Sequence, residues 1–256
     1  MSFDLGPMLE GFDYVPGRVT ARLVVGDDGR EKIQMRTELG LVQLEADGPP
    51  DGKERMGYPS LLHFHRARMA PGHPLPSLRL TSEECHELFE EAGLYYMRYS
   101  CCLQLRDYRR AERDTTCNLE AMDLCRDHAI DDDDRLLFEE YRPLVLMMRA
   151  RARAGRLMED GDPCGAADQI AEAISAVRRL LASNGSAYIT GEADADIRAL
   201  EELAQELRGC GADVVDRVEL RLELRRAIDR EDYRLAAELR DALRSVDCHR
   251  PNDSTS

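Results

Sequence analysis

Residue types that could bind a metal ion or act as a nucleophile occur in this chain at spacings that suit neither role. Cys125 and His128 are three residues apart and could face one metal ion from a helix, but two further ligands are missing nearby. A thiol inside a helix and a histidine near the helix C-terminus, favoured there by the helix dipole, explain the same residues. Cys85 and His86 are adjacent, and adjacent side chains diverge on a helix, which argues against a nucleophile–base pair.

The remaining histidines and the acidic run give no stronger signal. His63, His65 and His73 lack a carboxylate or cysteine at the spacing of a metal site, so we interpret them as solvated loop histidines. Asp131–Asp134 cannot all face one ion, and we interpret this run as an acidic cap before a helix. The sequence also lacks a glycine-rich phosphate loop, a G-x-S-x-G turn and an HExxH pair. We therefore expect no catalytic residue, no metal ion and no cofactor, and a protein that is not an enzyme.

Charge and composition restrict the partners. The 256 residues carry a net charge of −15, whereas a protein that binds the phosphate backbone needs a positive surface. The segment 213–247 has eight arginines against ten acidic residues, so we expect nucleic acid to be an unlikely main ligand. No apolar run approaches the roughly 20 residues that span a bilayer, and no signal-peptide pattern is present. We expect a cytoplasmic protein without membrane contact, whose eight cysteines, none in a CxxC pair, stay reduced.

The N-terminal part has the period-two pattern of strands. Apolar residues alternate through 18–25 and 32–36, on either side of the Gly26–Gly29 turn signal, and a third short run follows at 41–45. This pattern predicts a three-stranded antiparallel meander. Because three strands alone leave one face uncovered, the sheet is expected to pack on helices.

The middle of the chain has the pattern of helices. We predict a short helix at Tyr58 to Ala70 and long helices at 83–105, 108–127 and 163–181. A further long helix is predicted to begin after Asp131–Asp134 and to run through Tyr141 to Met158. A further charged helix at 192–208 carries one apolar side, formed by Ile197, Leu200, Leu203 and Leu207.

The C-terminal part predicts a tight helical hairpin. Its first helix, 218–230, and its second, which begins after Asp232, each have an apolar stripe in steps of three and four. The first stripe consists of Leu220, Leu222, Leu224, Ala227 and Ile228, and the second of Leu235, Ala236, Leu239, Ala242, Leu243 and Val246. Asp232 is a suitable N-cap, and Ala236 and Ala237 allow the two backbones to approach closely. Helices this short cannot bury all their apolar surface on each other. That surface is therefore expected to contact the rest of the chain, a second copy or a partner.

This hairpin, over roughly residues 214 to 247, resembles the UVR motif, first known from the B and C subunits of the bacterial excision nuclease, and Ala227 of its first helix is also in place. The residues that carry the resemblance are Asp232, Tyr233, Ala236, Ala237, Arg240 and Asp241, whereas Arg234 stands where the family commonly has glutamate. The resemblance implies pairing with other UVR hairpins or with partner proteins, including Clp-type ATPases and activators of protein-arginine kinases. The expected partner-binding residues are Tyr233, Leu235, Ala236, Ala237, Leu239, Arg240, Asp241 and Leu243.

The helical middle is similar to a tetratricopeptide repeat (TPR). The segment 103–111 looks like the turn between the two helices of that repeat, with Arg106 where glycine is usual. A weaker second copy includes Gly161-Asp162, and an unrelated helical bundle stays an alternative. Several aromatic and methionine side chains could line a peptide groove or pack in the helical core: Tyr95, Tyr96, Tyr99, Tyr108, Met97, Met147 and Met148.

The predicted fold class is mainly α, of the α+β type, with an N-terminal β-meander, a repeat-like (TPR-like) helical middle and a C-terminal helical hairpin. The predicted segments are a lead-in (1–17), the meander (18–46), a loop-rich connector (47–80), the helical domain (81–182), a linker with a charged helix (183–213), the UVR hairpin (214–247) and a tail (248–256).

The functional hypothesis is a bacterial, non-enzymatic interaction or scaffold protein that uses the UVR hairpin to bind a partner protein or to self-associate. One alternative is a DNA-repair accessory that binds nucleic acid through the UVR segment. Another is a regulator of a Clp-type ATPase or a protein-arginine kinase.

Overall fold

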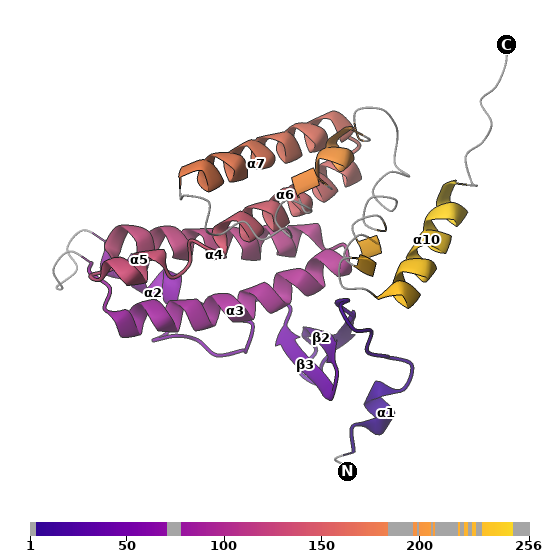
Figure 1. Cartoon of the computed structure of the whole chain (residues 1–256). Coiled ribbons are helices and arrows are strands. Elements are labelled where there is room, and N and C mark those ends of the chain that lie inside the picture. Colours follow the sequence, from indigo (N-terminus) through magenta and orange to yellow (C-terminus); the bar gives the residue numbers. More distant parts are fainter. Residues whose placement is uncertain are drawn as a thin grey trace. The chain divides into compact units, whose positions relative to one another are not determined.

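The structure, a computed structural model, describes residues 4–70, 78–183, 197–198, 200–205, 207, 220, 223–224, 227–228 and 232–247 (Figure 1). The chain divides into two compact units, Met1–Ala152 and Arg153–Ser256. The sheet and the first helices therefore share one unit, and the boundary falls within the segment 81–182 that was predicted as one helical domain. Within the described residues, no helix combines the length and the apolar composition that a membrane span requires.

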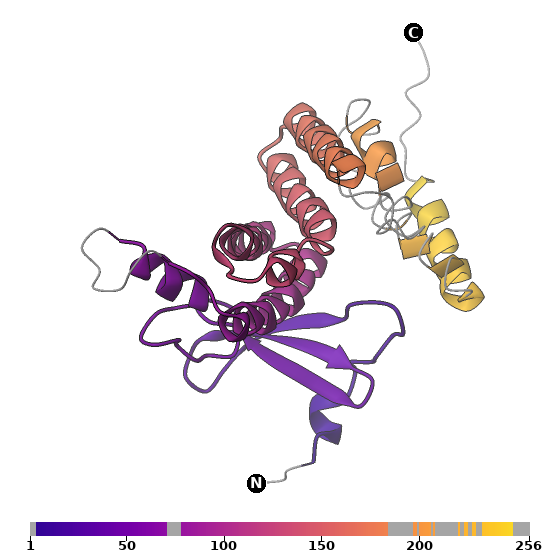
Figure 2. The same cartoon turned by 60° about the vertical axis from the view of Figure 1, so that its left-hand side comes forward.

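The first unit contains the predicted antiparallel meander. Its strands are β1 (Ala21–Val25), β2 (Glu31–Thr37) and β3 (Gly40–Glu45), in the order β1-β2-β3 (Figure 2). The Gly26 N–H donates to the Arg30 carbonyl at 2.8 Å and closes the turn between β1 and β2. The alternation of the sequence thus predicted both the strands and their order.

The N-terminal segment covers one face of this sheet. It contains a short helix, α1 (Gly6–Leu9), which the prediction of an irregular lead-in did not include. The Arg22 guanidinium donates from Nε to Gln34 Oε1 and from Nη2 to the Met8 carbonyl, both at 2.8 Å. Its central carbon also lies 4.4 Å from the centre of the Phe12 ring, the distance of a cation–π contact.

Capping side chains determine where the first helices begin. α2 (Leu61–Arg68) follows Ser60, whose hydroxyl oxygen accepts a backbone N–H of the first turn. α3 (Ser82–Gln104) follows Thr81, which forms a reciprocal capping box with Glu84. Both helices were predicted, with ends shifted by up to three residues.

The helix predicted after the acidic run is two helices in the structure. α4 (Tyr108–His128) ends before Asp131, which caps the five-residue helix α5 (Asp132–Leu136) by accepting a backbone N–H at 2.9 Å. A turn then leads into α6 (Arg142–Glu159). The capping by Asp131 confirms the interpretation of the acidic run as a helix cap. The aspartates in the first turn of α5 also complement the helix dipole.

The turn between α3 and α4 contains Arg106 in a left-handed backbone conformation, with φ of 59°. The Asp107 N–H reaches back to the Cys102 carbonyl at 2.8 Å, as in a Schellman C-cap. The Asp107 carboxylate then accepts the Arg110 N–H at 3.1 Å and caps α4. The same residue therefore ends one helix and begins the next.

The turn between α6 and α7 (Pro163–Ser183) repeats this geometry. Gly161 has φ of 78°, and the Asp162 N–H donates to the Leu157 carbonyl at 2.8 Å. The Asp162 carboxylate accepts the Gly165 N–H at 2.8 Å. The two turns that resemble a TPR junction thus share one local structure.

Buried side chains of the first unit form two clusters. One joins α2, α3, α4 and the start of α6, with Leu88, Met122 and Phe138 among its members. The other packs Ile33 of the sheet against Tyr99 of α3, so the sheet is covered by helix as expected. The aromatic and methionine side chains whose role was open are mostly core: Tyr95, Tyr99, Tyr108 and Met147 are buried, Met97 and Met148 are half-buried, and Tyr96 is exposed.

The second unit contains α7 and α10 (Tyr233–Asp247), together with short helical stretches between them. The predicted apolar side of the charged helix is confirmed, because all four of its residues are buried: Ile197, Leu200, Leu203 and Leu207. Arg178 on α7 forms an ion pair with Glu201 at 2.6 Å.

Candidate functional site

The C-terminal hairpin turns at Asp232. Its backbone N–H donates to the Ala227 carbonyl at 2.8 Å, which closes the first helix. Its carboxylate accepts the Leu235 N–H at 3.1 Å, and its carbonyl accepts the Ala236 N–H at 2.9 Å, which starts α10. Asp232 is therefore the N-cap that the sequence predicted.

The inner seam of the hairpin consists of small and branched apolar residues. Ala227, Ala236 and Leu239 are buried, and three half-buried leucines pack against them: Leu220, Leu224 and Leu235. Alanine on both helices removes the bulk that would otherwise hold the backbones apart. The predicted alanine seam is thus present in the described part of the hairpin.

The predicted partner-binding residues fall into three sets. Ala236, Leu239 and Leu243 are buried within the chain, so a partner does not reach them while the hairpin is folded. Leu235 and Ala237 are half-buried. Tyr233, Arg240 and Asp241 are exposed. The side chain of Val246, which continues the predicted stripe, lies outside the described residues.

Two exposed apolar side chains flank the turn. Tyr233 is 70% exposed and Ile228 is 51% exposed. The hydrogen bond between Ala227 and Asp232 closes the turn. Ile228 directly follows the first of these two residues, and Tyr233 directly follows the second. We refer to Ile228 and Tyr233 as the hairpin tip. Ile228 belongs to the apolar stripe of the first helix, so the sequence pattern did not predict its exposure.

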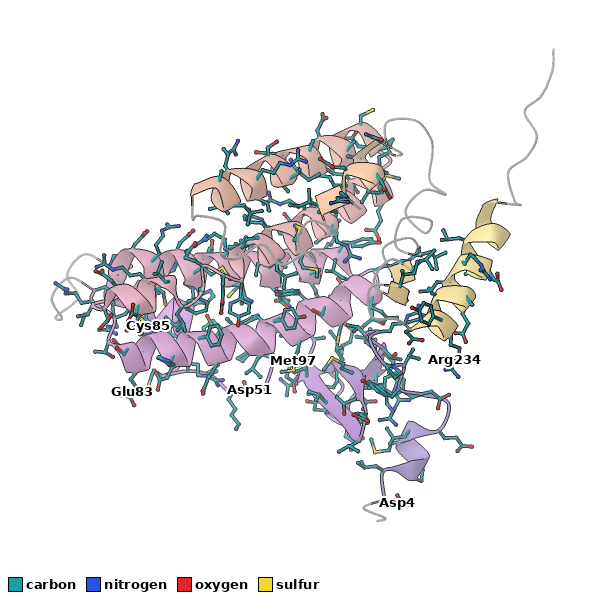
Figure 3. The ribbon with its side chains drawn as sticks, viewed as in Figure 1. Asp4, Asp51, Glu83, Cys85, Met97 and Arg234 are labelled. Atoms are coloured by element: carbon teal, nitrogen blue, oxygen red, sulfur yellow. The ribbon has the colours of Figure 1, made fainter. Side chains whose placement is uncertain are left out.

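The charges of α10 are locally balanced. Arg234, which projects from the N-terminal part of α10 in Figure 3, lies 3.9 Å from Glu238 between Nε and Oε1. Arg240 Nε lies 3.6 Å from Asp241 Oδ1. All four side chains are more than half exposed, so each pair is weak, but each arginine has an acidic neighbour. The described part of α10 therefore has no purely basic face.

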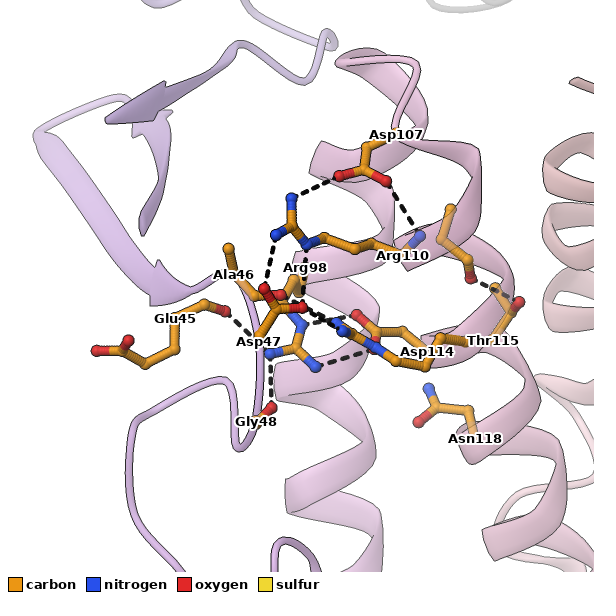
Figure 4. A network of polar contacts seen from close by, with 12 residues as sticks. Glu45, Ala46, Asp47, Gly48, Arg98, Asp107, Arg110, Asp114, Thr115 and Asn118 are labelled. Carbon is orange, nitrogen blue, oxygen red and sulfur yellow. Dashed lines mark hydrogen bonds and ion pairs between the residues drawn. The ribbon is translucent and has the colours of Figure 1, made fainter. Parts of the chain in front are cut away.

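A polar network in the first unit was missed by the sequence analysis (Figure 4). Arg98 on α3 donates from Nε and Nη2 to the two carboxylate oxygens of Asp114 on α4, at 2.6 and 2.9 Å. Its Nη1 donates to the Glu45 and Gly48 carbonyls at 2.9 and 2.8 Å. Because both side chains are buried and all these groups are paired, the arrangement fastens the end of β3 to the helices.

The rim of this network is more exposed. Asp47 accepts hydrogen bonds from Arg110 Nη2 and Arg113 Nη1, each at 2.6 Å. The Arg110 guanidinium, aided by that of Arg113, holds the pKa of the Asp47 carboxyl well below its usual range. The rim thus adds a second tie between the connector and α4.

Three thiols and one histidine of the first unit are removed from water. Burial raises the pKa of the Cys101, Cys102 and Cys117 thiols to about 12, so these thiols stay protonated and unreactive. His65 is buried in α2 rather than solvated, which contradicts the interpretation of a loop histidine. His73 lies outside the described residues. Within the part of the chain that the structure describes, no three acidic, histidine or cysteine side chains are grouped to hold a metal ion.

No protein-family model, no curated protein and no solved structure matches this chain. The resemblances to the UVR motif and to the tetratricopeptide repeat therefore stay predictions that depend on the residues quoted for them. The candidate site is the C-terminal hairpin, and its accessible apolar part is the hairpin tip.

Proposed function

We propose that the chain is a non-enzymatic interaction protein whose C-terminal hairpin presents the hairpin tip to a partner protein. The observation that carries the proposal is the exposure of Tyr233 and Ile228 beside a turn whose inner seam is buried. The buried seam stabilises the hairpin, and the exposed side chains of the hairpin tip can be covered by a partner protein. Tyrosine and large aliphatic side chains are common anchors of protein interfaces because they bury much area at little conformational cost.

The charge pattern favours a protein over nucleic acid as this partner. Attraction to phosphates is weakened where an arginine lies beside a carboxylate, as Arg234 and Arg240 both do. The net charge of −15 also disfavours binding to nucleic acid. In such an interface the apolar hairpin tip forms the centre, and the charged residues of both signs around it form the polar rim.

The first unit then serves as the scaffold. Its buried Arg98–Asp114 network joins the end of β3 to the capped helices α3 and α4. We propose that the protein acts in the cytoplasm, in keeping with the location expected from the sequence.

The test is quantitative affinity purification from the native cells. Full-length protein with Ile228→Asp and Tyr233→Asp is compared with wild type and with Leu39→Asp, which changes an apolar residue that is 93% exposed in the first unit. We expect the tip variant to lose at least one protein that wild type and the control both retain. Circular dichroism checks that the variants are folded. If the folded tip variant retains every wild-type partner, the proposal is wrong.

A further inference from the structure

Strand β1 forms an open edge of the sheet. The hydrogen bonds from Gly26 N–H to the Arg30 carbonyl and from Arg36 N–H to the Thr20 carbonyl, both 2.8 Å, define which residues of the hairpin face β2. In an antiparallel pair, successive residues alternate between facing the partner strand and facing away from it. The backbone N–H and C=O groups of the remaining three residues therefore point outward: Ala21, Leu23 and Val25.

These outward groups have no backbone partner among the described residues. At the opposite edge, the Glu45 N–H donates to the Pro50 carbonyl at 2.8 Å and the Glu45 carbonyl accepts from Arg98, so the chain covers the end of β3. The outward backbone groups of Leu41 and Gln43 on β3 have no backbone partner among the described residues. The edge at β1 differs in that, among the described residues, all three of its outward-facing residues are available to another strand.

Side chains on β1 add apolar surface to this edge. Leu23 is 44% exposed and Val25 is 72% exposed, and both lie on one face of the strand. Natural edge strands often carry proline, lysine or a bulge that prevents pairing. β1 has none of these, since its only charged residue, Arg22, is held over its own sheet by Gln34 and the Met8 carbonyl.

We propose that β1 pairs antiparallel with β1 of a second copy of the chain, about a twofold axis at Leu23. Leu23 then faces Leu23 of the second copy, and Ala21 faces Val25 of the second copy. All three outward-facing residues of each copy are used, so two hydrogen bonds form at each of three residue pairs. The exposed Leu23 and Val25 side chains become neighbours across the new strand pair.

The two neighbouring registers of this strand pair, with the twofold axis at Arg22 or at Val24, are less favourable. A twofold axis at Arg22 would place two arginines directly opposite each other, which is unfavourable. An axis at Val24 would leave Ala21 without a partner and would form fewer hydrogen bonds. With the axis at Leu23, Arg22 faces Val24 of the second copy, so no like charges are opposed. β1 is therefore complementary to β1 of a second copy. Their backbone groups form hydrogen bonds, their exposed apolar side chains meet, and no like charges face each other.

The paired state joins two three-stranded sheets into one continuous sheet. It removes the open edge at β1 from both copies, which a monomer leaves exposed to any unrelated strand. Each copy carries a net charge of −15, so association is opposed by long-range repulsion. Added salt screens this repulsion and is expected to strengthen the pairing.

The first test measures mass in solution. Light scattering after gel filtration should give twice the chain mass of 29.0 kDa for wild type, with the dimer fraction rising with salt. Leu23→Lys with Val25→Lys should shift the protein to the monomer, because opposed lysines block the edge. Leu39→Lys, in the turn between β2 and β3, is the matched control and should stay dimeric. A monomeric wild type at all concentrations, or a dimer unchanged in the folded edge variant, would overturn the proposal.

The second test examines the register by cross-linking. Leu23→Cys is made in a background in which three native cysteines are changed to serine: Cys164, which is the exposed one among the described residues, and Cys210 and Cys248, which lie outside them. Facing residues of a hydrogen-bonded pair have Cα atoms about 5.5 Å apart, within the range of a disulfide. Oxidation should therefore join two chains through this cysteine, whereas Leu39→Cys in the same background should not do so. Equal cross-linking of both variants would contradict the register. Because the hairpin tip is unchanged in these variants, this outcome is independent of partner binding there.

Discussion

Arg98 and Asp114 form a buried ion pair in which two guanidinium nitrogens donate to two carboxylate oxygens, at 2.6 and 2.9 Å. The Arg98 side chain is 1% exposed and Asp114 is fully buried. The same guanidinium binds the Glu45 and Gly48 carbonyls, so one side chain joins α3, α4 and the end of β3. This geometry makes the pair the main polar link between the sheet and the helices.

Removing the charge of Asp114 is expected to destabilise the protein strongly. Asp114→Asn leaves the Arg98 guanidinium buried without a counter-charge, and the expected loss in free energy of unfolding is roughly 3–5 kcal/mol. Urea denaturation followed by circular dichroism measures this loss. The control is Arg126→Met, which removes ion pairs between side chains that are 46–55% exposed and should cost about 1 kcal/mol or less. Equal effects of the two substitutions would show that burial of the pair is unimportant.

The left-handed backbone at Arg106 predicts that glycine is more stable than alanine at this position. Its φ of 59° lies in the left-handed region, where a side chain is disfavoured and glycine is not. Arg106→Gly should therefore be more stable than Arg106→Ala by about 1 kcal/mol, since both variants lack the arginine side chain and differ only in the Cβ. The comparison is made by thermal or urea denaturation. If alanine is as stable as glycine at this position, the left-handed turn is not populated in solution.

The turns show how far local sequence determines this fold. Asp107, Asp162 and Asp232 each begin a helix as the N-cap, and the helix boundaries could be predicted because a cap acts on residues next to it. The Arg98–Asp114 pair could not be predicted. Its partners are 16 residues apart on different helices, and many other charged pairs in this sequence have similar spacings. Only the packing of α3 on α4 selects this one.

The hairpin shows the same limit. The apolar stripe correctly indicated Ala236 and Leu239 as one face of a helix, because the helical period is local. Which face meets a partner depends on what covers the stripe, and the stripe is largely covered by the chain itself. The exposed Ile228 has the same chemistry as its buried neighbours, so sequence pattern alone did not distinguish it.

Stability is expected to decrease in mild acid because of His65. Desolvation lowers the pKa of this buried histidine from 6.5 to about 4, so the folded state keeps it neutral where the unfolded state binds a proton. The sign follows from this difference: the stabilisation is complete above pH 6.5 and is lost as pH falls from 6.5 towards 4, by up to about 1.4 kcal/mol per pH unit. Urea denaturation at several pH values should show that His65→Gln has a shallower slope in this window. An unchanged slope would mean that His65 is solvated.

The buried seam and the hairpin tip are expected to respond differently to truncation. Leu239→Ala removes a buried side chain and should lower the stability of the second unit by roughly 2–5 kcal/mol. Tyr233→Ala removes an exposed side chain and should change stability by about 0.5 kcal/mol or less. Hydrogen exchange of α10 amides in the two variants measures the difference. Strong destabilisation by Tyr233→Ala would show that the ring is covered within the chain and is not free for a partner.

Site-specific photo-cross-linking tests the central claim most directly. A benzophenone amino acid is introduced at Tyr233, and at Leu39 as the exposed control, in the cells that naturally make the protein. The proposal predicts a covalent adduct of defined mass with another polypeptide at position 233 and none with that polypeptide at position 39. Illumination that yields no adduct at position 233, or the same adducts at both positions, would contradict a partner-binding role of the hairpin tip.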